Sequence, residues 1–145
     1  MSKSEDAIVQ FNKGGVNCTQ CVLLSFSDEL GLDKKLALKI AYGFGGGMCQ
    51  GEVCGAVTGA IMVLNLKYGQ DEIDDKESKE KIYEAVRVFS EKFKNINGSI
   101  ICRDLLRYDL NQEGARKYAR ENGLFKEVCP KAIKDAIEIL EDILH

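Results

Sequence analysis

Apolar residues recur at the spacing of an α-helix along most of the chain, and this periodicity constrains the fold more than any other feature. After the acidic run DEIDDKESKE, residues Ile82, Val86, Phe89 and Phe93 are separated by four, three and four positions, which places them on one helical face. No segment of useful length alternates apolar and polar residues, so no β-sheet is predicted. The chain is therefore expected to be all-α.

Capping and stop signals divide the chain into about six or seven helices. The expected starts are at Asn17, Asp33, Cys54, the acidic run, Ser99, Asn111 and about Pro130, with stops at Gly31, Gly69 and Gly123. The longest irregular connection is the glycine-rich segment 43–53, before the third predicted helix. Since no repeat or flexible linker interrupts the 145 residues, we expect one helical bundle over residues 1–145, forming a single domain.

The segment GFGGGMCQGEVCGAVTG, residues 43–59, contains seven of the fourteen glycines and two of the six cysteines. A phosphate loop would need a Gly-Lys pair followed by Ser or Thr, which the chain lacks, and the dinucleotide fingerprint fails because Met48 replaces its third glycine. Nucleotide binding is therefore disfavoured. Gly51, Gly55 and Gly59 recur at every fourth position, which predicts a bare helical ridge that packs closely against another backbone.

Charge and hydropathy exclude several further classes. A net charge of −3 with dispersed basic residues argues against nucleic acid as a partner. The N-terminus lacks the apolar core of a signal peptide, and the longest apolar run, residues 55–66, reaches only about 18 Å as a helix, so no membrane span is predicted. We expect a cytoplasmic protein, whose cysteines would be metal ligands or redox groups rather than structural disulfides.

Four of the cysteines fall at predicted helix N-termini. Cys18 follows the cap Asn17, Cys54 follows the glycine-rich segment, Cys102 lies in the first turn after Ser99, and Cys129 directly precedes Pro130. The positive end of a helix favours a thiolate over a thiol, typically by about 0.3–1 kcal/mol. Arg103 and Lys126 are expected to act in the same direction. Thiolates are the form of cysteine that attacks disulfides and binds metals.

The usual cysteine motifs do not fit this pattern. The Cys18-Thr-Gln-Cys21 segment lacks the βαβ context of a thioredoxin, and Val22 stands where haem attachment requires histidine. Only one Cys-x-x-Cys is present, whereas zinc prefers paired short spacings. The only histidine is His145, which disfavours a Cys–His hydrolase. Each cysteine could instead be a small buried apolar residue, above all Cys21, one turn along an apolar helix face.

Several motifs together resemble a known family. Cys18 after Gly14-Gly15-x-Asn17, the segment Cys54-Gly55-Ala56-Val57-Thr58-Gly59, and single cysteines at 102 and 129 are similar to the C_GCAxxG_C_C family of redox-active proteins. The resemblance extends to GFGGGM, Cys102-Arg103-Asp104-Leu105-Leu106 and Cys129-Pro130. It implies that Cys18, Cys54, Cys102 and Cys129 correspond to the defining cysteines of the family, which also resembles the iron–sulfur portion of split-Soret cytochromes. Cys21 and Cys49 lie outside these four.

Three hypotheses follow, and none assigns a catalytic residue or a stand-alone enzyme activity. In the first, Cys18, Cys54, Cys102 and Cys129 bind an iron–sulfur cluster and the protein transfers electrons. In the second, a metal-free protein cycles between dithiol and disulfide through pairs such as Cys49 and Cys54, with Cys21 as a further redox candidate. In the third, a structural zinc or purely helical module docks on an oxidoreductase. The expected partner is an oxidoreductase or electron-transfer protein, and a homodimer is a further possibility.

Overall fold

The computed structural model describes residues 1–145 and contains eight α-helices and no β-strand, which confirms the all-α prediction. One isolated antiparallel bridge joins Val53 to Ile101. The helices are α1 (Lys3–Lys13), α2 (Cys18–Ser27), α3 (Lys34–Ala41), α4 (Gly55–Tyr68), α5 (Lys76–Asn97), α6 (Cys102–Leu106), α7 (Ala115–Glu121) and α8 (Leu124–Leu144). A 3₁₀ turn, η1 (Tyr42–Phe44), and a π turn, η2 (Gly47–Gly51), lie between α3 and α4.

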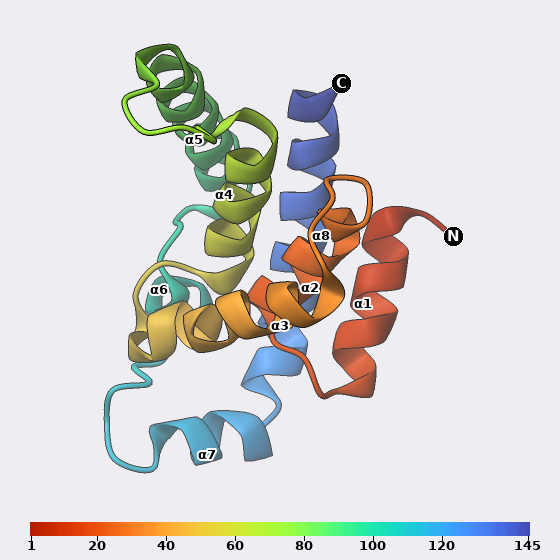
Figure 1. Cartoon of the computed structure of the whole chain (residues 1–145). Helices are drawn as coiled ribbons and strands as arrows, with labels where there is room; N and C mark the ends of the chain where they lie inside the picture. The colour runs from red at the N-terminus through yellow and green to blue at the C-terminus, as the bar shows by residue number, and fades with distance from the viewer.

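The long helix α8 is the centre of the bundle. It packs against α1, α2, α4 and α5 along its length, while α6 and α7 contact its first part and α2 lies along α4 (Figure 1). The predicted apolar stripe of α5 faces the core: Phe89 and Phe93 are fully buried, and the half-buried Ile82 and Val86 pack beside them. Burial of this stripe, rather than helix propensity alone, holds α5 in place.

The helix that the periodicity did not predict is α1. Its start is a capping box, in which the Ser2 side chain accepts a hydrogen bond from the Glu5 N–H and the Glu5 carboxylate accepts one from the Ser2 N–H. Ala7 is its only buried apolar residue, and Phe11 packs at the edge of the core. Because α1 comes first, the glycine-rich segment precedes the fourth helix of the structure.

Helix α8 begins at Leu124 rather than near Pro130. Gly123, with φ 70°, supplies the left-handed residue before it, and Pro130 lies inside the helix. An internal proline removes one helical hydrogen bond, and the sequence pattern therefore pointed to a start at this residue. The six earlier residues are helical because Leu124, Phe125 and Val128 pack on a small second core around Leu110.

The starts predicted at Asn17 and Asp33 are confirmed, whereas the residue before α6 is Ile101, whose N–H donates to the Ser99 hydroxyl. The Asn17 and Asp33 side chains accept hydrogen bonds from the N–H groups of Gln20 and Leu36, as expected for helix caps. Asn111, however, does not open α7, which begins at Ala115 after Gly114. No helix of the chain combines the length and the apolar character that a membrane crossing needs.

Candidate functional site

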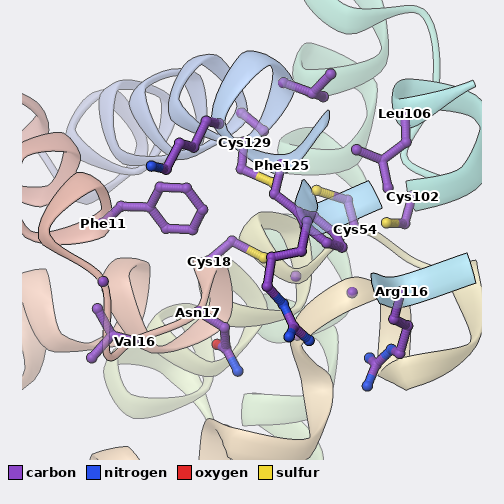
Figure 2. Close-up of a pocket in the computed structure, with 18 of the residues that line it drawn as sticks. Phe11, Val16, Asn17, Cys18, Cys54, Cys102, Leu106, Arg116, Phe125 and Cys129 are labelled. Atoms are coloured by element: carbon purple, nitrogen blue, oxygen red, sulfur yellow. The ribbon is translucent and has the colours of Figure 1, made fainter. Parts of the chain in front are cut away.

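Cys18, Cys54, Cys102 and Cys129, here called the four-cysteine set, line a single cavity of about 570 Å³. Each comes from a different element: α2, the residue before α4, α6 and α8. Figure 2 shows the four side chains directing their sulfur atoms toward one shared space. Residues separated by more than a hundred positions in sequence are therefore neighbours at one end of the bundle.

Three members of the four-cysteine set occupy the predicted helix starts. Cys18 is the first residue of α2, Cys54 is the N-cap of α4, and Cys102 is the first residue of α6. The prediction for Cys129 is wrong, because α8 begins at Leu124 and Cys129 is its sixth residue. The unpaired N–H groups of α8 belong to its first turn, before Cys129, so the start of this helix does not stabilise a thiolate there.

A short backbone pairing places Cys54 next to Cys102. The Cys54 N–H donates to the Ile100 carbonyl at 2.7 Å, and the Cys102 N–H donates to the Glu52 carbonyl at 2.6 Å. These two bonds flank the Val53–Ile101 bridge, so the end of the glycine-rich segment and the start of α6 run antiparallel. The arrangement fixes two sulfur-bearing residues that are 48 positions apart (102 minus 54).

Close packing of α4 on α2 places Cys18 in the same cavity. A Cβ atom on Gly55 would collide with the Cys18 sulfur, and one on Gly59 would lie 2.7 Å from the Thr19 carbonyl oxygen. Only glycine permits this approach at both positions, which confirms the predicted ridge for Gly55 and Gly59. Gly51 does not belong to the ridge, because it ends the π turn before α4 with φ 70°.

The glycine-rich segment turns sharply over the cavity. Gly46 and Gly47 have φ 66°, and Met48 and Cys49 continue in the left-handed region with φ 59° and 61°. Non-glycine residues adopt this region at some cost, so the turn needs support from outside. The Asn111 side-chain amide provides one such contact by donating to the Gln50 carbonyl at 2.7 Å.

Cys18 is the member of the set whose thiolate the surroundings favour. Its pKa is lowered to about 7, chiefly because the Cys129 thiol donates a hydrogen bond to it, with further bonds from the backbone N–H groups of Gly46 and Thr19. The same interaction raises the pKa of Cys129, because that thiol is the donor. The Gly46 and Thr19 N–H groups act on Cys18 and not on Cys129, which favours the thiolate at Cys18 within this pair.

Burial outweighs the helix ends at the other two positions. Desolvation raises the pKa of Cys54, although the N–H groups of Ala56 and Val57 act in the opposite direction, and it raises the pKa of Cys102 to about 12. The expectation that every helix start would favour a thiolate therefore holds only for Cys18. Transfer out of water disfavours the charged form by more than a helix end stabilises it.

The cation that acts on Cys102 is also not the one expected from the sequence. Arg103 turns away to pair with Glu52 at 3.0 Å and to donate to the Gly51 carbonyl at 3.1 Å. Arg116 of α7 instead favours the Cys102 thiolate, although desolvation dominates the pKa. The predicted neighbour Lys126 does line the cavity. Sequence adjacency thus missed Arg116, which reaches the site only through the folding of α7.

The two remaining cysteines lie in different surroundings. Cys49 is exposed, lines the cavity, and its thiol contacts the Gly43 carbonyl oxygen at 3.4 Å. Cys21 is 3% exposed in the core, and burial raises its pKa to about 12. It is absent from the cavity lining. All six cysteines are free thiols, and no three His, Cys, Asp or Glu side chains are arranged to hold a single metal ion.

The chain matches the family described as "Putative redox-active protein (C_GCAxxG_C_C)" over residues 16–143. The match covers most of the sequence, so the chain belongs to this family, as the resemblance implied. The four-cysteine set and its cavity lie within the matched residues. No curated protein and no solved structure was found to match.

Proposed function

We propose that the four-cysteine set binds an iron–sulfur cluster and that the protein transfers electrons to or from an oxidoreductase or another electron-transfer protein. One observation carries the proposal: four sulfurs from four different elements line one cavity. Four cysteine thiolates are the usual ligand set of such clusters. Helix packing alone does not require cysteines from four separate elements to line one cavity.

The donor set and its surroundings fit this group. The lining contains cysteine sulfurs but no carboxylate, and sulfur ligands select iron–sulfur clusters or other soft metal centres. A cluster contains more than one iron atom, so its cysteine ligands would not need to meet at one point as the ligands of a single metal ion do. The Gly46 N–H, directed at the Cys18 sulfur, is the type of donor that tunes cluster potentials. When bound, the cluster would supply a centre that gains and loses single electrons.

The residues of the chain have separate roles in this proposal. Cys18 offers a thiolate near neutral pH, while Cys54 and Cys102 lose their protons only when a metal binds. The half-buried Phe125 and the buried Leu106 exclude water from the sulfurs. An apolar wall lowers the local dielectric, which is one of the ways in which a protein sets a reduction potential.

The direct test is anaerobic purification and reconstitution with iron and sulfide. We expect stoichiometric iron and acid-labile sulfide, a brown protein, and visible absorption that bleaches on reduction. A colourless, iron-free protein after reconstitution would exclude the proposal. Quantitative zinc in the purified protein would favour a structural zinc module instead.

A substitution pair tests the choice of ligands. Cys54→Ser should reduce the iron content to background, because an alcohol is a poor substitute for a thiolate. Cys21→Ser is the matched control, since Cys21 is buried on the same bundle but lies outside the cavity. Circular dichroism confirms that both variants are folded. Equal loss of iron from both variants would show that the ligand assignment is wrong.

Metal-free thiol–disulfide chemistry is the second candidate, because the exposed Cys49 lines the same cavity as the buried Cys54. Oxidation would join their sulfurs with loss of two protons and two electrons to an acceptor disulfide, which is reduced to two thiols. Treatment of the metal-free protein with oxidised glutathione and peptide mapping would reveal a Cys49–Cys54 crosslink. If the peptide map shows Cys49 and Cys54 as free thiols and contains no crosslinked peptide, this candidate is excluded.

A further inference from the structure

The charged side chains that line the cavity are all positive, and the four-cysteine set does not explain this excess of basic residues. Four of its lining residues are basic and none is acidic, although the chain has 23 acidic and only 20 basic residues. None of the four forms an ion pair or a side-chain hydrogen bond to another protein group, whereas Lys117 beside them pairs with Glu121. We call these residues the basic rim: Lys13, Arg116, Arg120 and Lys126.

The fold brings the basic rim together from three helices. Arg116 and Arg120 are four residues apart on α7, so they share one helical face, which is the face that lines the cavity. Lys13 ends α1, and Lys126 lies in the first turn of α8. No cationic motif is visible in the sequence, because the four positions are spread over more than a hundred residues.

Arg116 is an exposed residue that lies against the glycine-rich segment and lines the cavity. A Cβ atom on Gly46 would lie 3.1 Å from a terminal nitrogen of the guanidinium, so this group lies over the glycine-rich segment. Its charge also acts on Cys102, which lines the same cavity. Figure 2 shows Arg116 below Cys102, with its guanidinium extending away from the four sulfurs in this view. Arg116 therefore lines the cavity with a guanidinium that no protein carboxylate neutralises.

The rest of the lining is apolar and concave. Phe11, Val16, Phe125 and Val128 are half-buried side chains that contribute to the wall. A cavity of about 570 Å³ is within the range of roughly 300–1,000 Å³ that small-molecule sites occupy. Apolar walls with a few converging charges accept a ligand that has an apolar body and a charged head.

We infer that this cavity binds a small organic anion, a phosphate ester or carboxylate with an apolar body, whose charged head is held by the basic rim beside the four-cysteine set. Paired arginines suit these head groups because each guanidinium can donate two parallel hydrogen bonds. The inference rests on the proposed function only for the redox role of the neighbouring sulfurs. Binding of the anion itself requires no metal.

The test is a calorimetric titration at low salt with 1-naphthyl phosphate and, separately, with its neutral analogue 1-naphthol. Both the anaerobically reconstituted protein and the metal-free protein are used. We expect saturable binding of the phosphate ester in both forms and at least about tenfold weaker binding of the alcohol, because it lacks the charged head. Added salt should weaken the binding of the ester.

Variants of α7 provide the matched comparison. Arg116→Gln and Arg120→Gln should each weaken binding of the ester by about tenfold or more. Lys117→Gln removes one positive charge from the same helix, but the Lys117 side chain is 76% exposed and does not line the cavity. The Lys117→Gln variant should therefore bind the ester as tightly as the unmodified protein. Circular dichroism establishes that each variant is folded.

Three results would overturn the inference: equal binding of ester and alcohol, equal weakening by Lys117→Gln and Arg116→Gln, or loss of ester binding on reconstitution. The last result would show that the basic rim only neutralises the cluster. Failure of the proposed function can be told apart from failure of this inference. A protein that takes up no iron, but still binds the ester through Arg116 and Arg120, would exclude the iron–sulfur cluster and leave anion binding intact.

Discussion

The two ends of the bundle are filled by different kinds of residue. Where the C-terminal parts of α4 and α8 meet, Leu64, Ile137 and Leu140 are fully buried and close the core. Where α2, α4 and α6 begin, cysteines, glycines and exposed cations surround a cavity. Branched side chains interdigitate and leave no space, whereas glycine leaves backbone bare. The closed end therefore supplies stability, and the open end leaves room for chemistry.

The largest effect is expected from a substitution at the closed end. Leu64→Ala should lower the free energy of unfolding by about 2–5 kcal/mol, because it removes buried methyl groups and leaves a cavity. Chemical denaturation measures the change. Leu66→Ala on the same helix is the control, since Leu66 is 39% exposed and should cost much less. Similar losses at the two positions would contradict the view that this end carries the stability.

A smaller effect is expected where α4 packs against α2. Gly59→Ala should destabilise the protein by about 1–3 kcal/mol, because its Cβ would lie 2.7 Å from the Thr19 carbonyl oxygen. In an exposed helix the same change would stabilise by about 1 kcal/mol. Gly43→Ala is the control, because a Cβ there meets no atom within 4 Å. A stabilised Gly59→Ala variant would show that the two helices do not need this contact.

The smallest effect concerns thiol reactivity at the open end. The pKa of Cys18, about 7, lies below the ordinary value of 9.0, so its alkylation in the metal-free protein should rise as pH passes through about 7. Cys129→Ala removes the thiol that donates to Cys18. The pKa of Cys18 should then rise, and alkylation at neutral pH should slow by about tenfold.

Peptide mapping after iodoacetamide labelling measures this rate, with the exposed Cys49 as an internal control in the same sample. The labelling of Cys49 should not change in the Cys129→Ala variant. An unchanged Cys18 rate would mean that its backbone partners, and not Cys129, set its pKa.

Much of the helical architecture was predictable because its signals are local. The caps at Asn17 and Asp33 and the stripe through Phe89 and Phe93 each depend on residues within a few positions of one another. The errors also have local causes. Pro130 is typical of a first helical turn, but the packing of Leu124 and Phe125 extends α8 by six residues before it. The start of α1 is marked by the polar capping box of Ser2 and Glu5.

Most of the helices, the placement of Cys18, Cys54 and Cys102 at helix starts, and the resemblance to the family could be read from the sequence. Only the tertiary structure decided which groups share the cavity: the bridge that joins Cys54 to Cys102, the entry of Cys129 from within α8, and the approach of Arg116. It also decided which sulfur favours a charge, since desolvation depends on everything packed around a thiol. Helix starts are encoded by neighbours in sequence, whereas burial and long-range contacts are properties of the whole folded chain.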